Sequence, residues 1–295
     1  MLTGILLLVC TSILWVVQGA VISMAAEKKL NLSAIQTLAA LVIMCLTLPF
    51  SAVAGPPDRL TFLSLTVAGF ANCGAYQLMN LAMKNGPHGM TWAISQSAFA
   101  IPFLMGITLF DVPCPAVRGV SLAMLVASMI VMGIFGKKDD SGCAGGKVRW
   151  AVCCLCAYIV IGISQCGGSL PSYFVNDSVS TAGNVLVRVG VLGIGIFAGG
   201  LFNLAFFERT PVFKPGFTVQ SLLLTSAMIT ANLLAFKAFD IISINGAGAI
   251  SYPIVTGLSI AFFFIYTALK LKEKPSLPAI LGILMCLAGI IGMIF

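Results

Sequence analysis

The feature that most constrains this chain is a succession of apolar segments, each long enough to cross a lipid bilayer. The first runs from Met1 to Ala26 without a charged residue, and a membrane-spanning helix needs about 20 such residues. With 59% hydrophobic and 8% charged residues over 295 positions, the composition lies outside the range of soluble proteins. The sequence therefore predicts an integral membrane protein in contact with a lipid bilayer.

The apolar segments between the short charged stretches predict ten membrane-spanning helices. A β-barrel would instead show alternating segments of ~10 residues, so the expected fold class is an all-α integral membrane protein. The predicted spans are residues 2–24, 33–54, 60–83, 88–109, 116–135, 150–171, 180–205, 217–239, 246–269 and 276–295.

The basic residues predict the orientation of these helices, because cytoplasmic joins carry an excess of Lys and Arg. Twelve basic residues fall in the joins after the first, third, fifth, seventh and ninth spans. The opposite joins hold only Arg59 and Arg118, with Lys237 at the end of the eighth span. We expect a multi-pass protein of the plasma membrane, a bacterial inner membrane, with both termini outside. The net charge of +7 is mainly a topology signal and does not indicate nucleic acid.

The ten cysteines and one histidine predict neither a metal site nor a cofactor. Most of the cysteines lie inside apolar spans, where cysteine acts as a small packing residue, and their spacing does not match a metal-ligand pattern. An enzyme would be expected to carry convergent groups, such as a Ser with a His or paired intramembrane aspartates. The sequence favours a protein that is not an enzyme.

The two halves of the chain resemble each other, which predicts an internal duplication. The motif "NLAMK" at 80–84 recurs as "LLAFK" at 233–237, "AIS" at 93–95 recurs at 249–251, and Gln18 is matched by Gln165. The matches occur in the same order at offsets of 153, 156 and 147 residues. We expect a first repeat at 1–135, a polar linker at 136–149 and a second repeat at 150–295.

Each predicted repeat contains five spans, and an odd number forces the two copies to point in opposite directions. The result is an inverted repeat about an axis in the membrane plane, an architecture of secondary transporters. The charges agree, because "KLKEKP" after the ninth span is strongly basic and "DVPCPAVR" after the fourth is nearly neutral.

These residues resemble the drug/metabolite transporter superfamily and its EamA-like proteins. The second half carries the pattern in "LAFK", "YPIV", "LKEKP" and "GILMCLAGIIGMIF", with Pro253, Glu273, Gly282 and Gly289 on the proline, acidic and glycine positions. The first half departs from it, with Gln96 near the expected proline. The passages "GAYQLMNLAMKNGPHGM" and "AGGLFNLAFF" are similar to the rhamnose/proton symporter and glucose-uptake branch.

This resemblance implies a secondary active transporter of a small polar metabolite by alternating access, with a sugar as the lead substrate and protons as the coupling ion. Exporters of amino acids or drug-like metabolites in the same superfamily share the pattern and remain an alternative. An alternative of another class is a membrane scaffold subunit without transport activity, although a scaffold would not need repeated amides in the middle of its spans.

Polar side chains at membrane depth mark the candidate solute pathway, because each costs free energy unless it faces protein or water. Asn72, Tyr76 and Asn80 are spaced i, i+4, i+8 and share one helix face, with Gln77 about 100° away. Amides with aromatic rings suit an uncharged polar ligand; the alternative role is interhelical hydrogen bonding. The predicted substrate-binding residues are Gln18, Asn72, Tyr76, Asn80, Trp92, Gln96, Gln165, Arg188 and Tyr252.

Arg188, within "NVLVRVGVLG", lies too deep in its span for its charge to reach water along the side chain. We expect Asp240 to neutralise either Arg188 or Lys237, and these three residues form the predicted charge-pair or coupling group. The alternative is that Arg188 binds an anionic group of the substrate, which would favour a carboxylate or phosphate over a neutral sugar.

Overall fold

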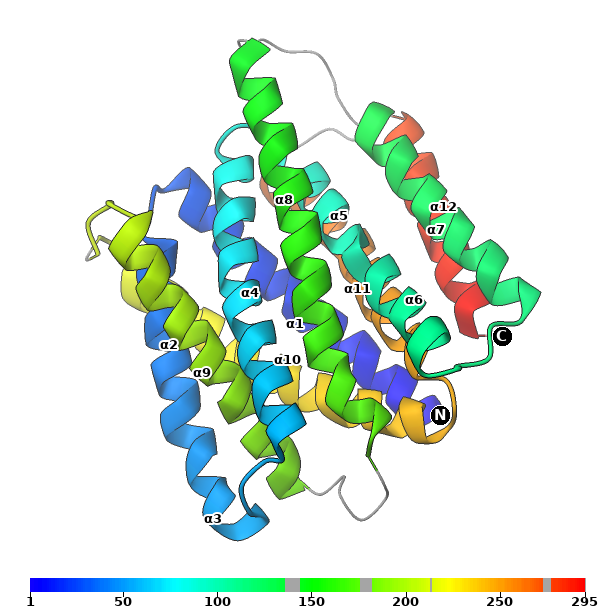
Figure 1. The fold of residues 1–295 in the computed structure, drawn as a ribbon. Helices are drawn as coiled ribbons and strands as arrows, with labels where there is room; N and C mark the ends of the chain where they lie inside the picture. The colour runs from blue at the N-terminus through cyan, green and yellow to red at the C-terminus, as the bar shows by residue number, and fades with distance from the viewer. Residues whose placement is uncertain (136–143, 176–181, 213, 273–276, 295) are drawn as a thin grey trace.

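The computed structural model describes residues 1–135, 144–175, 182–212, 214–272 and 277–294. Within these ranges the regular elements are all helical, which confirms the expected all-α class (Figure 1). The α-helices are α1 (Leu2–Glu27), α2 (Leu32–Thr47), α3 (Ser51–Ala54), α4 (Arg59–Met83), α5 (His88–Gln96), α6 (Ala100–Leu109), α7 (Ala116–Phe135), α8 (Ala144–Ser169), α9 (Ala182–Phe206), α10 (Phe217–Ile244), α11 (Ser251–Lys270) and α12 (Leu277–Ile294). Short 3₁₀ turns are η1 (Leu48–Phe50), η2 (Ser97–Phe99), η3 (Leu170–Tyr173) and η4 (Gly248–Ile250).

Seven helical segments in the described ranges are long and apolar enough to cross a membrane. They include α1, the continuous segment from α2 to α3, and the segment from α5 to α6, together with segments built on α8, α9, α10 and α11. Two shorter apolar helices lie at residues 116–128 and 280–293. The chain is therefore an all-α, multi-pass membrane protein. Helix α4 is not among the seven; it carries Asn72, Gln77 and Asn80, which lower its mean hydropathy.

Side-chain caps explain where two of the helices begin. Asn31 precedes α2 and its Oδ1 accepts a hydrogen bond from the backbone N–H of Ala34 at 2.8 Å. Asp58 precedes α4 and accepts from the backbone N–H of Thr61 at 2.9 Å. Each cap satisfies a backbone donor that the first turn of a helix leaves without a partner.

Helices α4 and α9 pack backbone against backbone because glycines stand at their contact. A β-carbon at Gly69 would overlap the backbone oxygen of Leu192, and one at Gly195 would overlap that of Thr66. A β-carbon at Gly199 would lie 3.0 Å from the oxygen of Phe70. Small residues allow this approach in membrane helices, where dispersion contacts drive association.

The remaining helices pack in pairs around this contact (Figure 1). Helix α1 packs against α10 and α11, α8 packs against α4, and α2 packs against α9. Helices α7 and α12 pair with each other at one edge of the bundle. The centre of the bundle is thus enclosed by α1, α4, α5, α8, α9, α10 and α11.

Some sequence predictions fall partly on residues outside this description, including the ends of the predicted spans at 180–205 and 276–295. Residues 136–143 of the predicted linker and Glu273 lie outside the described residues. The last six residues of the predicted linker, 144–149, are helical and form the first turns of α8. The nine cysteines in the described ranges are free thiols.

Candidate functional site

A small cavity lies in the centre of the bundle, between seven helices. The volume open to the centre of a water molecule is about 50 Å³, so the cavity has room for a few waters. Six of the nine predicted substrate-binding residues line it: Gln18, Asn72, Tyr76, Gln96, Gln165 and Tyr252. They come from α1, α4, α5, α8 and α11, so residues far apart in the sequence meet at one site.

Gln18 and Tyr76 form a direct contact between α1 and α4. The Tyr76 hydroxyl donates a hydrogen bond to Gln18 Oε1 at 2.6 Å, and both residues are at least 95% buried. The Gln18 Nε2 atom lies 3.5 Å from the backbone oxygen of Ala227 on α10, a long and therefore weak bond. The amide oxygen of Gln18 thus has a strong hydrogen bond, whereas its amide nitrogen has only a weak one.

A pair of amides joins α8 to α5. Gln165 Nε2 donates to Gln96 Oε1 at 3.4 Å, again at the weak end of hydrogen-bond distances. Among the described residues, Gln165 Oε1 and Asn72 Oδ1 have no hydrogen-bond partner. A buried amide oxygen without a partner costs about 1–3 kcal/mol, so water or a bound ligand is expected to supply donors here.

Aromatic rings form the other wall of the cavity. Tyr252 on α11 packs between Trp15 and Phe239, with ring centroids at 6.2 Å and 4.8 Å. Gly168 on α8 faces it closely, since a β-carbon there would lie 2.7 Å from the Tyr252 hydroxyl oxygen. Trp15, Phe236 and Tyr252 line the cavity and offer ring faces beside its amides.

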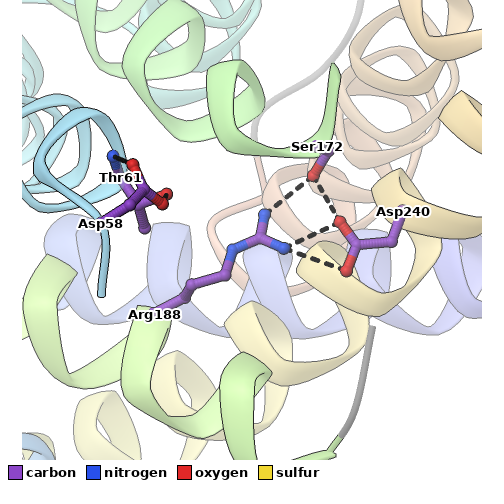
Figure 2. A network of polar contacts seen from close by, with 5 residues as sticks. All are labelled: Asp58, Thr61, Ser172, Arg188 and Asp240. Carbon is purple, nitrogen blue, oxygen red and sulfur yellow. Dashed lines mark hydrogen bonds and ion pairs between the residues drawn. The ribbon is translucent and has the colours of Figure 1, made fainter. Parts of the chain in front are cut away.

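Arg188 and Asp240 form a buried ion pair next to the cavity (Figure 2). Arg188 Nη1 lies 2.7 Å from Asp240 Oδ1 and 2.9 Å from Oδ2, and its Nη2 donates to the Ser172 hydroxyl at 2.8 Å. Ser172 in turn donates to Asp240 at 2.7 Å. The Arg188 guanidinium also stacks over Phe236, 4.6 Å from the ring centroid. This is one of the two pairings that the sequence predicted.

Three predicted residues lie outside the cavity lining: Trp92 packs against another ring, Asn80 is buried, and Arg188 pairs a charge. Trp92 is fully buried and stacks on Phe263 at 4.9 Å, so neighbouring helices cover the ring. Asn80 is fully buried two turns beyond Asn72, past the end of the cavity. Arg188 lies behind Phe236, where Asp240 holds its guanidinium.

The structure adds lining residues that the sequence did not single out: Trp15, Ser164, Asn232 and Phe236 among them. Ser164 and Asn232 donate to backbone oxygens of Ala68 and Met228. Ser164 lies one residue before Gln165, and Asn232 one residue before "LLAFK", so their nearness to the matched segments is the signal that could have found them. Lys237 lies partly buried on α10, next to Phe236.

Comparisons with known proteins define the fold and leave the family open. No family model matches the chain, and no curated protein matches it. Its fold is similar to that of another protein known from a crystal structure, with a TM-score of 0.67 at 12% identity, over 99% of this chain and 98% of the other. The class that fold and site define is an all-α membrane protein whose helices enclose a polar cavity.

Proposed function

We propose that the protein is a secondary transporter that carries a small, uncharged polar solute through the central cavity by alternating access. The observation that carries the proposal is the cavity itself: buried amides from both halves of the chain converge there, and two of their oxygens lack partners among the described residues. Polar groups of this kind are expensive inside a membrane protein and mark solute pathways.

The proposed architecture is ten spans in two inverted repeats, residues 1–135 and 150–295. The helix pairings support it, because each helix of the first half and its counterpart in the second half pack against corresponding neighbours. Helix α1 packs on α10 and α11, and its counterpart α8 packs on α4 and on α5 and α6. The equivalent helices α2 and α9 pair with each other, as do α7 and α12. Transporters built from such repeats bind substrate between them.

A neutral solute fits the charge distribution around the cavity. Arg188, a cation that packs on the lining residue Phe236, is compensated by Asp240. What remains at the surface of the cavity is a set of amides, hydroxyls and ring faces, with apolar side chains such as Ile161 and Leu192 beside them. Amides accept and donate hydrogen bonds to hydroxyl groups, and rings pack against the apolar face of a sugar, so a monosaccharide is the lead substrate.

The cavity as it stands is narrow, and solute entry requires helices to separate. The closed barrier on one side is built from the Arg188 cluster and an aromatic pair beyond it. Phe110, after α6, stacks on Tyr173 of η3 with ring centroids 4.1 Å apart and planes at 6°. Tyr173 follows Ser172 directly, so the ion pair and the aromatic stack belong to one layer. By the charge rule this layer faces outside the cell, together with both termini.

Uptake by proteoliposomes tests the proposal. The purified protein is reconstituted, and exchange of labelled monosaccharides against internal unlabelled solute is measured without any ion gradient. Gln165→Leu is expected to lose most of the exchange, because it removes an amide from the cavity. Asn245→Leu is the matched control, since Asn245 is exposed at the end of α10 and donates to the backbone of its own helix. Equal exchange in both variants would contradict a solute site at this cavity.

A further inference from the structure

A second buried polar cluster lies where α4 meets the end of α9, apart from the central cavity. Glu208 follows α9 and is only 8% exposed. Its Oε2 accepts a hydrogen bond from Gln77 Nε2 at 2.6 Å, and its Oε1 accepts one from the Thr210 hydroxyl at 2.6 Å. Both donors are neutral.

The Glu208 carboxylate is not compensated by a basic side chain in the part of the chain that the structure describes, where the recorded ion pair is that of Arg188 with Asp240. Arg209, next in sequence, is exposed, and Lys214 Nζ donates to the backbone oxygen of Lys29. A buried carboxylate that meets only neutral donors is costly. Positive charge is therefore missing from this site.

Atoms beside the carboxylate are also short of partners. Gln77 is 6% exposed, and its Oε1, on the amide that contacts Glu208, has no hydrogen-bond partner among the described residues. Asn80, one turn further along α4, has neither amide atom satisfied within the same residues. Since the orientation of a glutamine amide is assigned from its contacts, a turned Gln77 would direct its oxygen at Glu208. Carboxylate and amide oxygens are ligands for hard cations, and a protonated carboxyl would donate to that same oxygen.

We propose that Glu208 is the binding site of the coupling cation, a proton or a sodium ion, with Gln77 as its partner. The inference rests on the proposed transport function. It links the ion to the solute through α4: Gln77 is adjacent to Tyr76, whose hydroxyl bonds Gln18 across the cavity. A cation on Glu208 changes the contact between Glu208 and Gln77. Because Gln77 and Tyr76 are neighbours on α4, a shift of this helix also moves Tyr76 at the cavity.

The charged and titratable groups around Glu208 come from three elements. Helix α4 contributes Cys73, which contacts Asn203 of α9 at 3.6 Å. The segment after α9 contributes Arg209 and Lys214, and Lys29 lies before α2. All four are present in wild type and variants alike, so a difference between wild type and a Glu208 variant isolates the carboxylate.

The test is thermal unfolding of the purified protein in detergent, because a ligand that binds the folded state raises its apparent stability. Sodium chloride is titrated at fixed pH with choline chloride keeping the ionic strength constant, and in a separate series the pH is lowered without sodium. Wild type is compared with Glu208→Gln, which keeps shape and hydrogen bonding, and with Glu27→Gln, which makes the same change at an exposed glutamate outside the proposed site. A bound cation is expected to raise the unfolding temperature by roughly 3 °C for each tenfold excess over its dissociation constant.

A sodium response present in wild type and Glu27→Gln but lost in Glu208→Gln identifies sodium. A response to acid alone, lost in the same variant, identifies the proton. The proposal is overturned if Glu208→Gln responds like wild type, if wild type shows neither response, or if Glu27→Gln loses the response equally, which would assign the response to the overall negative charge of the protein. No solute is needed, so failure of this test is separate from failure of the exchange assay.

Discussion

The buried pair of Arg188 and Asp240 gives the sharpest quantitative prediction. The two side chains are 7% and 0% exposed, and Asp240→Asn would leave the guanidinium buried without a counter-charge. Breaking one partner of such a pair costs about 3–5 kcal/mol, much more than the net worth of the pair itself. For a chain of this length that corresponds to an unfolding temperature lower by roughly 6–15 °C.

The same reasoning predicts the result of a double-mutant cycle. Arg188→Gln combined with Asp240→Asn removes both charges, and two amides can still bond each other and Ser172. The double variant is therefore expected to be more stable than Asp240→Asn alone. Thermal unfolding of wild type, both single variants and the double variant measures the cycle. If Asp240→Asn costs less than about 1 kcal/mol, or if the double variant is the least stable of the four, the buried-charge argument is refuted.

Three further predictions concern single contacts. Tyr76→Phe removes the 2.6 Å bond to Gln18, and is expected to cost about 1 kcal/mol of stability and to slow solute exchange; unchanged values of both would contradict a role for the contact. Gly195→Ala places a methyl group against the α4 backbone and is expected to abolish folded protein or cost more than about 3 kcal/mol, which size-exclusion chromatography and unfolding would detect. Burial pushes the pKa of Asp58 up, but the hydrogen bonds from Thr61 outweigh it and lower the pKa below the ordinary value. This stabilisation is present above the unfolded pKa and is lost as pH falls through the folded pKa, so wild type should lose stability relative to Asp58→Asn in acid; parallel pH curves would disprove it.

The local sequence predicts much of the site. The predicted repeat singles out Gln18 and Gln165, and both side chains line the cavity. Helical spacing separates Tyr76 from Gln77, and the two side chains indeed face different neighbours, Gln18 and Glu208. These features depend on the period of a helix and on the matched segments of the two halves, and both can be recognised in the sequence alone.

Other features depend on which helix packs against a given residue. The spacing of residues along one helix does not predict that neighbour. Trp92 has the polarity and position of a site residue, yet Phe263 covers it. Glu208 lies beyond the end of an apolar span, where a charge is normally exposed, yet it is buried against Gln77 of α4 and Thr210. The number of spans and the inverted sense of the repeats remain predictions.

The glycine contact between α4 and α9 restricts how this protein can move. Gly69 and Gly195 leave no side-chain layer between the two backbones, so neither helix can slide along the other without steric overlap. Yet α4 belongs to the predicted first repeat and α9 to the predicted second. If the protein works by alternating access as proposed, we expect α4 and α9 to move together, with Tyr76 and Arg188, rather than one repeat to move against the other.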